Sequence, residues 1–367
     1  MRDGYRNILL VQLGDIGDVV LTTPTIRAVK EVYPDARVSV LVRKPFGDIL
    51  LADPNLFEVV ESEKTRGTLF HNLREYLRLV NRLQQAHYDL VIDLRAGDRG
   101  AILSFCTGAR ERIGRYCGDK RFWHNFLFTT TVREPQAAPL PVHPGADQSL
   151  RIVRFIGIDT EDTMPRLYIN PTDQARATEL LSGYGLTPAN RWATINPFSR
   201  WQYKEWDHGN WSQVIDSLWS KHKLPSVLIG SKEETSAAES IIKGCEGYSF
   251  NLAGKTTLGE LVAIISMSTL NLGVDSAAPH IAGAVGTPSL TIHGPSDWQA
   301  WRVADTLQKV ISANIECVPC NSKGCNNTGT SQCLIQLKTE AVVEMAEDIL
   351  RKIIKQEVSG HHKLIPD

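Results

Sequence analysis

The sequence predicts an α/β protein built from two Rossmann-like α/β/α domains. Short β-branched runs alternate with longer helical stretches along the whole chain, and this alternation is typical of parallel sheets made from right-handed βαβ units. The length of 367 residues corresponds to two domains at roughly 100–200 residues each. Two such domains would face each other across a cleft, which is the usual place for a ligand.

The composition excludes several other classes of protein. Hydrophobic residues make up 42% and charged residues 22% of the chain, so it is neither disordered nor a coiled coil. The 40 Lys and Arg against 41 Asp and Glu give a net charge of −1. Binding to a nucleic-acid backbone needs a clear basic excess, and we therefore expect no nucleic-acid partner.

The apolar runs of the sequence are short. One of the longest, 261–265, falls far below the roughly 20 residues that span a bilayer. The apolar stretch near the N-terminus is interrupted by Gln12 and Asp15, which is not typical of a signal peptide. We therefore expect a cytoplasmic protein whose thiols stay reduced.

The individual elements follow from these runs. The expected strands are 8–13, 38–42, 90–94, 192–196, 226–230, 270–275 and 289–293. The expected helices are 19–32, 69–85, 146–155, 211–221, 233–243 and 258–266, and a last helix carries Val342, Ala346, Ile349, Leu350 and Ile353 on one face. Proline and glycine accumulate over 165–190, so we place the domains at 1–170 and 171–367. Packing of the last helix back onto the first domain is an alternative arrangement.

The first candidate site is the turn 14–18, directly after the first strand. Gly14 and Gly17 allow a sharp turn and a close approach to a ligand, but Val19 breaks the GxGxxG pattern of dinucleotide-binding proteins. Asp18 would be held ionised by the helix dipole, which suits a general base. The alternative is that Asp18 only caps the helix.

The second candidate site is the loop after strand 192–196. Ser199, Arg200 and Lys204 place a hydroxyl and two cations near the end of a strand, where they can hold a diphosphate. An ordinary solvated loop is the alternative.

The third candidate site is the junction of strand 270–275 with a helix of small residues. Ser276 and the first N–H groups of that helix, from Ala277 onward, form an anion site, and His280 lies one turn further on. A lone histidine is more often structural. Glu234, after the neighbouring strand, could accept hydrogen bonds from ribose hydroxyls. Together the three sites predict a nucleotide-binding C-terminal domain and a carboxylate-bearing N-terminal domain.

At these positions the chain resembles the bacterial lipopolysaccharide-core heptosyltransferases, glycosyltransferase family 9. The runs that carry the resemblance are ILLVQLGDIGDVVLTTP, NPFSRWQYKEW and GVDSAAPHIAGAVGTPSLTIHGPSDWQAWR, and CVPCNSKGCNNTGTSQCL is similar to the heptosyltransferase III branch. The resemblance implies a GT-B fold and an ADP-heptose donor. It further implies an inverting, metal-independent transfer to a hydroxyl of the lipopolysaccharide inner core, with no cofactor required for catalysis.

The resemblance also implies roles for individual residues. Asp18 corresponds to the catalytic base. The donor-binding positions are Ser199, Arg200, Lys204, Glu234, Asp275, Ser276, Ala277 and His280. Two of them depart from the family, which often has Gly in place of Ala277 and Thr in place of Arg200.

The stretch 95–133 is a candidate surface for the acceptor. It holds eight Lys and Arg against three acids, with Phe122, Trp123 and Phe126 interleaved. A basic and aromatic surface suits an anionic, lipid-linked acceptor at the cytoplasmic face of the inner membrane, and a solvated face is the alternative. The residues assigned to acceptor binding are Arg95, Arg99, Arg112 and Arg115. We expect a monomer that associates peripherally with this membrane.

Four cysteines form a separate cluster, C-x₂-C-x₄-C-x₇-C. Cys317, Cys320, Cys325 and Cys333 could hold a structural zinc ion or an iron–sulfur cluster. The spacing is not that of a standard zinc ribbon, so free thiols or a disulfide are the alternatives.

Two other functions fit the same sequence. A nucleotide-sugar epimerase of GT-B-like fold would need acid and base groups near the donor sugar and no lipid acceptor. The other is a nucleotide-sugar-binding protein that has lost transfer activity, and the presence of both Asp18 and Lys204 counts against it.

Overall fold

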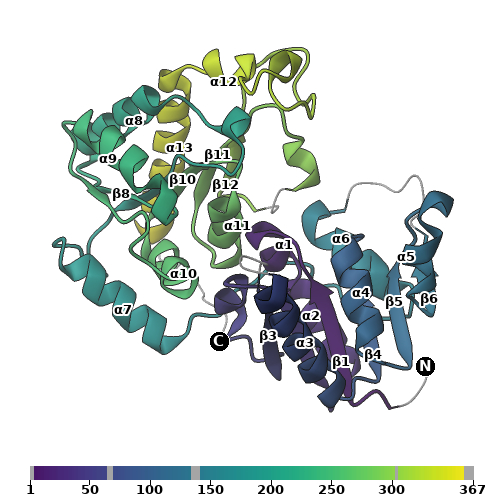
Figure 1. Ribbon diagram of the computed structural model, residues 1–367. Helices are drawn as coiled ribbons and strands as arrows, with labels where there is room; N and C mark the ends of the chain where they lie inside the picture. The colour runs from purple at the N-terminus through teal and green to yellow at the C-terminus, as the bar shows by residue number, and fades with distance from the viewer. Residues whose placement is uncertain (1–3, 64–68, 134–140, 302–304, 359–367) are drawn as a thin grey trace. The chain divides into compact units, whose positions relative to one another are not determined.

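The computed structural model describes residues 4–63, 69–133, 141–301 and 305–358. The chain forms two compact units, Met1–Tyr168 and Ile169–Asp367, which we call unit 1 and unit 2. Each unit contains a six-stranded parallel sheet with helices packed against it (Figure 1). The predicted α/β class is confirmed.

Unit 1 is built on a sheet in the order β3-β2-β1-β4-β5-β6. The central strand β1 pairs with β2 and β4, and its register places Val11 opposite Asp93 at the end of β4. The strands are β1 (Asn7–Gln12), β2 (Arg37–Arg43), β3 (Glu58–Ser62), β4 (Leu90–Asp93), β5 (Glu111–Arg115) and β6 (Thr130–Val132). The sequence predicted β1, β2 and β4, which are buried apolar runs. It did not predict β3, β5 and β6, which carry charged or threonine residues.

The helices of unit 1 differ from the prediction in two respects: the first predicted helix is divided in two, and α4 (Asp98–Cys106) and α5 (Phe122–Phe126) were not predicted. The single helix expected over 19–32 is wrong, because α1 ends at Leu21 and α2 begins at Thr23. Pro24 has no N–H to donate to the carbonyl oxygen of Val20, and the hydroxyl of Thr23 donates to that oxygen instead, at 2.9 Å. The helices are α1 (Ile16–Leu21), α2 (Thr23–Val32), α3 (Leu69–Gln85), α4 (Asp98–Cys106), α5 (Phe122–Phe126) and α6 (Pro144–Arg154).

Unit 2 repeats the design with a sheet in the order β12-β11-β10-β7-β8-β9. The central strand β10 pairs with β7 and β11, so both loops that follow these neighbouring strands lie beside the end of β10. The strands are β7 (Ala193–Asn196), β8 (Ser226–Leu228), β9 (Ser249–Asn251), β10 (Leu270–Val274), β11 (Ser289–Ile292) and β12 (Gln308–Ile311).

The helices of unit 2 bury an extensive core. The last helix packs on α8, and Val342, Ala346, Ile349 and Leu350 join the core on the face that the periodicity predicts. Helix α10 contacts α7 and α11. The helices are α7 (Pro171–Ser182), α8 (His208–His222), α9 (Thr235–Lys243), α10 (Leu258–Met267), α11 (Ala277–Ala284), α12 (Gln332–Ile335) and α13 (Thr339–Val358). Within the described residues, no helix combines the length and the hydropathy needed to cross a bilayer.

Candidate functional site

Asp18 lies in the first turn of α1, just after the turn that follows β1. Its Oδ2 accepts the backbone N–H of Asp15 at 2.8 Å, which completes a capping box with Asp15 as the N-cap residue. Gly14 packs against this carboxylate so closely that a Cβ would lie 2.4 Å from Oδ2, so any other residue would displace Asp18. The capping role predicted as an alternative therefore exists, but it uses only one carboxylate oxygen.

The other oxygen of Asp18 pairs with an arginine from the next strand of the sheet. Oδ1 lies 2.6 Å from Nη1 of Arg95, and the Asp18 side chain is 14% exposed while that of Arg95 is 41% exposed. Arg95 comes two residues after β4, the strand that pairs with β1. The pair fixes the orientation of the carboxylate and leaves its cationic partner accessible to solvent.

A buried acid, Asp93, is the last residue of β4 and bonds to the backbone of Arg95. Asp93 is fully buried, its Oδ1 accepts the backbone N–H of Arg95 at 3.0 Å, and its Oδ2 has no hydrogen-bond partner among the described residues. Burial raises the pKa of Asp93 to about 8, against the lowering effect of that hydrogen bond and of the charges on Arg95 and Arg115. Asp93 is thus mainly a neutral acid at pH 7. The sequence analysis did not select it, although an aspartate inside a predicted buried strand is a usable signal.

The other arginines assigned to the acceptor are held differently. Arg99 donates to the hydroxyl of Ser62 at 2.7 Å and to the carbonyl of Glu63 at 2.6 Å. Arg112 donates to the carbonyls of Leu127 and Ala109 at 2.9 and 2.5 Å. Arg115 interacts electrostatically with Asp93. Of the four predicted acceptor residues, therefore, the structure pairs Arg95 with Asp18. Arg99 and Arg112 instead donate hydrogen bonds to backbone carbonyls elsewhere in the unit.

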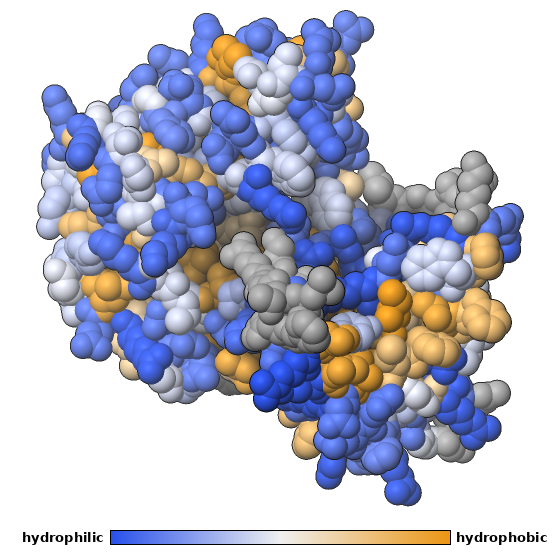
Figure 2. All heavy atoms as spheres, viewed as in Figure 1, coloured by the Kyte–Doolittle hydropathy of each residue, from blue (hydrophilic) through white to orange (hydrophobic). Residues whose placement is uncertain are grey.

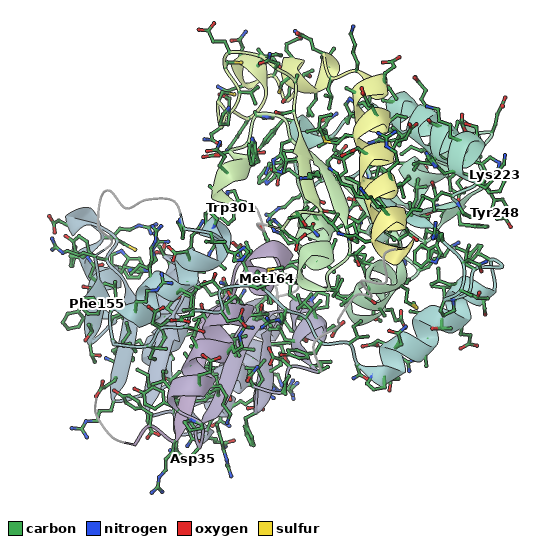
Figure 3. All side chains as sticks on the ribbon, turned by 180° about the vertical axis from the view of Figure 1, so that it is seen from behind. Asp35, Phe155, Met164, Lys223, Tyr248 and Trp301 are labelled. Atoms are coloured by element: carbon green, nitrogen blue, oxygen red, sulfur yellow. The ribbon has the colours of Figure 1, made fainter. Side chains whose placement is uncertain are left out.

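An apolar surface lies next to these arginines. Helices α4 and α5 are in contact, and Phe122 and Phe126 on α5 are 75% and 80% exposed. We call the exposed apolar residues of these two helices the aromatic face; they are Ile102, Phe105, Phe122, Trp123 and Phe126. Figure 2 shows apolar side chains gathered over this part of unit 1. In the same unit the exposed ring of Phe155 also projects outward (Figure 3).

In unit 2 the central residue is Asp275, which follows β10 directly and precedes α11. Its Oδ2 accepts hydrogen bonds from Nζ of Lys204 at 2.6 Å and from the hydroxyl of Ser296. Nδ1 of His293 lies 3.9 Å from the same oxygen. We call these four residues the Asp275 cluster. The sequence analysis selected Asp275 and Lys204 but missed His293 and Ser296, which follow β11.

The charges of the Asp275 cluster follow from burial and proximity. Burial by itself would raise the pKa of Asp275, but the charges of His293 and Lys204, with the hydrogen bonds from Lys204 and Ser296, lower it to about 2. Burial lowers the pKa of His293 to about 4, although Asp275 opposes this shift. At pH 7 the cluster therefore contains an ionised carboxylate, an ammonium group and a neutral imidazole.

The loop after β7 is bonded to the same strand–helix junction. The hydroxyl of Ser199 donates to the backbone carbonyl of Asp275 at 3.3 Å, and the amide of Asn196 donates to Oγ of Ser276 at 3.3 Å. The backbone N–H of Ser199 donates to Glu205 at 2.9 Å. Burial raises the pKa of Glu205, while this hydrogen bond opposes the shift. The structure therefore brings Ser199, Lys204, Asp275 and Ser276 together. It adds Asn196 and Glu205, whose roles depend on these tertiary contacts.

The other predicted donor residues lie around this junction. Ala277 is the first residue of α11. The guanidinium of Arg200 lies 5.3 Å from the centre of the Trp201 ring. Oε2 of Glu234 accepts the backbone N–H of Ser231 at 2.6 Å in a capping box. Glu234 also lies close enough to Glu205 to affect the pKa of that group.

A pocket of about 660 Å³ opens beside the Asp275 cluster, within the size range of small-molecule sites. It is lined by Asp275, Ser276, Pro279, His280, Ser289, Thr291, His293, Trp298, Trp301, Asp305, Thr306, Gln308, Lys309 and Val310. Nδ1 of His293 is buried and has no hydrogen-bond partner in the described parts of the chain. The pocket thus joins an anion-suited helix start to a wall that contains indole rings and a neutral imidazole.

The cysteine cluster does not form a metal site in this structure. All four thiols are free, Cys317 and Cys320 are exposed, and Cys333 is buried in the core of unit 2. Over the described residues, no three His, Cys, Asp or Glu side chains are arranged to hold a metal ion. The predicted zinc or iron–sulfur site is therefore not supported. Burial raises the pKa of the Cys333 thiol, and the nearby Cys325 and Cys320 add to this shift, so these thiols lie near one another without the arrangement of a metal site.

Two α/β units, each built on a six-stranded parallel sheet, define the GT-B fold, in agreement with solved structures that align with this chain. Residues 76–330 match the model of glycosyltransferase family 9 (heptosyltransferase). The chain belongs to this family, and it is a glycosyltransferase.

Individual relatives agree with this assignment. The chain is 32% identical over 294 residues to the lipopolysaccharide heptosyltransferase 3 of Escherichia coli K12, covering 78% of this chain and 82% of that protein. A glycosyltransferase family 9 structure from Veillonella parvula aligns with a TM-score of 0.79 at 20% identity, over 96% of this chain and 99% of the other. The E. coli heptosyltransferase WaaC with ADP-2-deoxy-2-fluoro heptose aligns with a TM-score of 0.69 at 18% identity, over 93% and 99%.

Proposed function

We propose that this protein transfers heptose from ADP-heptose to a hydroxyl of the lipopolysaccharide inner core, with inversion at the anomeric carbon and without a metal or other cofactor. The Asp275 cluster carries the proposal, because it joins a lysine and a helix N-terminus at the edge of a pocket. The name of the 32% identical relative and the ADP-sugar bound to WaaC support this choice of donor and acceptor.

Positive charge at the Asp275 cluster would stabilise the leaving group. As the bond between the anomeric carbon and the phosphate oxygen breaks, its electron pair passes to that oxygen and ADP gains negative charge. The ammonium of Lys204 has three N–H donors, of which one is directed at Asp275. The remaining donors and the first N–H groups of α11 can bind the diphosphate, which supplies the charge compensation that a divalent cation gives in other transferases.

Asp18 would act as the general base. The acceptor oxygen attacks the anomeric carbon on the face opposite ADP, and its proton passes to Oδ1 or Oδ2 of Asp18 as the new bond forms. A positioned base typically contributes about 10²–10⁴-fold in rate. The hydrogen bond from Asp15 and the ion pair with Arg95 hold the carboxylate in a fixed orientation for this step.

A donor screen tests the proposal. The purified protein is incubated with ADP-heptose and delipidated inner-core acceptor, and ADP release and the anomeric configuration of the product are measured by NMR. We expect ADP release that depends on the acceptor and is unaffected by EDTA. We also expect a product whose anomeric configuration is inverted relative to the donor. Release without acceptor would favour an epimerase or a hydrolase, and a preference for UDP- or GDP-sugars would contradict the proposed donor.

We further propose that the protein associates peripherally with the cytoplasmic face of the inner membrane through the aromatic face. Phe122 and Phe126 present apolar rings to solvent, while the surrounding stretch 95–133 has a basic excess. Exposed aromatic rings flanked by cations match the interface of an anionic bilayer. The lipid-linked acceptor would be found at the same interface.

Vesicle co-sedimentation tests this surface. Wild-type protein should bind vesicles that contain phosphatidylglycerol at low salt and should bind pure phosphatidylcholine vesicles more weakly. Phe122→Ser with Phe126→Ser should reduce binding at least about tenfold, since burial of one Phe side chain contributes about 1.5–3 kcal/mol. The matched control is Leu73→Ser with Leu77→Ser, a pair on α3 of the same unit that is 55% and 56% exposed. Equal losses in both double variants would remove the aromatic face from the proposal.

A further inference from the structure

A segment that carries three of the four clustered cysteines, Cys320, Cys325 and Cys333, contacts both loops that bond to Asp275. We call residues 320–333 the clip. At one end of the clip, the backbone N–H of Asn321 donates to the carbonyl of Pro295 at 2.7 Å, and Oδ1 of Asn321 accepts the backbone N–H of Asp297 at 3.0 Å. Ser296, whose hydroxyl donates to Asp275, lies between these two residues. Asn321 therefore fixes the backbone on both sides of a partner of Asp275.

At the other end of the clip, Ser331 contacts the loop that carries Lys204. The hydroxyl of Ser331 donates to the backbone carbonyl of Tyr203 at 2.6 Å, and Ser331 is 4% exposed. Tyr203 directly precedes Lys204, whose Nζ donates to Asp275 at 2.6 Å. Loss of this partly buried bond would leave the carbonyl of Tyr203 without its hydroxyl donor.

The middle of the clip is bonded to itself and to the core. The backbone N–H of Cys325 donates to the carbonyl of Thr330 at 2.7 Å, and the N–H of Gln332 donates to Sγ of Cys325 at 3.4 Å. Leu334, just beyond the clip, packs so tightly that a Cβ on Gly294 would lie 2.9 Å from it. The clip is thus held together by its own hydrogen bonds, and the chain just beyond it is packed against Gly294.

We propose that Asn321 and Ser331 are positioning residues that set the places of Ser296 and Lys204 at Asp275, and through them the affinity for the diphosphate of the donor. Neither residue lines the pocket, so both act through the loops that they hold. The proposal rests on the proposed function, because it assumes that a nucleoside diphosphate binds at the Asp275 cluster. It also gives the cysteine-bearing segment a role that needs no metal.

Single substitutions test the positioning role. Asn321→Ala and Ser331→Ala should each raise the dissociation constant of ADP, measured by calorimetry, about five- to tenfold, which corresponds to the loss of one hydrogen bond. The KM for the donor should rise by a similar factor, while the KM for the acceptor stays unchanged. Ser331→Thr keeps the hydroxyl and should restore wild-type values. Ser322→Ala, at an exposed serine of the same segment, is the matched control and should not differ from wild type.

A double-mutant cycle separates positioning from general structural damage. If Ser331 acts through Lys204, Ser331→Ala should change ADP affinity less than twofold in a Lys204→Ala background. Full additivity of the two substitutions would overturn the proposal. If the wild-type protein binds ADP, Asn321→Ala and Ser331→Ala variants with unchanged ADP affinity would also overturn it. A wild-type protein that does not bind ADP would instead overturn the proposed donor, and the positioning role with it.

Discussion

The two units use the same arrangement at the ends of their central strands, with different surroundings. Each has an aspartate after that strand, Asp18 in unit 1 and Asp275 in unit 2, and each aspartate lies 2.6 Å from a cationic nitrogen. The two carboxylates are similarly buried, with side chains 14% and 13% exposed. Their cations differ, since Arg95 is 41% exposed whereas Lys204 is 20% exposed.

The difference indicates separate roles for the two aspartates. The charges of His293, which is protonated in the acid range, and of Lys204, with the hydrogen bonds from Lys204 and Ser296, hold the pKa of Asp275 at about 2. Such a group stays ionised and orients Lys204, so it is unsuited to accept a proton. Asp18 has one backbone donor and one accessible arginine, and an arriving substrate can compete with a solvent-exposed partner. The difference supports the proposed division of roles, in which unit 2 would provide fixed charge and unit 1 would provide the carboxylate that accepts a proton.

The largest expected effect comes from Asp18→Asn. An amide cannot accept the proton of the acceptor hydroxyl, so kcat should fall by about 10²–10⁴-fold. ADP affinity, measured by calorimetry, should change less than twofold, because the substitution leaves the Asp275 cluster intact. Asp35→Asn is the matched control, since Asp35 is an exposed aspartate of the same unit with no role in the site. Near-wild-type turnover in Asp18→Asn would contradict the division of roles.

The next effect comes from the two cations. Lys204→Ala removes a donor to the diphosphate and leaves the buried Asp275 without its ammonium partner, so ADP affinity should fall by about 10–100-fold and kcat should also decrease. Arg95→Ala, the equivalent change in unit 1, should leave ADP affinity unchanged. Calorimetric titration of both variants measures the contrast directly. Equal losses in the two variants would show that the cations do not have separate roles.

The fold could be predicted from the sequence where burial is reflected in local composition. The central strands β1, β4, β7 and β10 are apolar runs, and burial of both faces of a parallel sheet requires such runs. The strands toward the sheet edges could not be predicted in the same way. β3 and β12, for example, contain charged residues and are only partly buried, and they are recognisable as strands only through their neighbours.

The candidate site divides in the same way. Residues next to a strand end, such as Asp18, Ser199 and Asp275, could be selected because strand ends in parallel sheets meet at one edge. Ser296 and Asn321 could not, because each acts through a tertiary contact that no local pattern records. The cysteine spacing could not decide between a metal site and free thiols, for a related reason. Spacing along the chain does not show that Cys333 packs into the core.

The smallest expected effect concerns Asp93, the buried acid that bonds to the backbone of Arg95. The Asp275 cluster has no counterpart of this acid. The pKa of Asp93 is raised from 3.8 to about 8 by burial, so between these values the folded state binds more protons than the unfolded state. The free energy of unfolding should therefore decrease as the pH rises from about 4 to about 8. Asn at this position keeps the acceptor for the N–H of Arg95 and carries no charge, so Asp93→Asn should remove this decrease.

Thermal unfolding at pH 5 and pH 8 measures the effect of Asp93→Asn. The Tm of the variant relative to wild type should rise between these two pH values by about 3 °C or more, since 1 kcal/mol corresponds to roughly 2–4 °C for a unit of this size. Asp35→Asn is the matched control, at an exposed aspartate on the outside of the same unit (Figure 3), and it should show no such change. If the Tm of Asp93→Asn has the same pH dependence as that of wild type, the pKa of Asp93 in the folded protein is not raised, and Asp93 is ionised at pH 8. Arg95 would then be held between two charged carboxylates, and the contrast between the two units would rest on Asp18 alone.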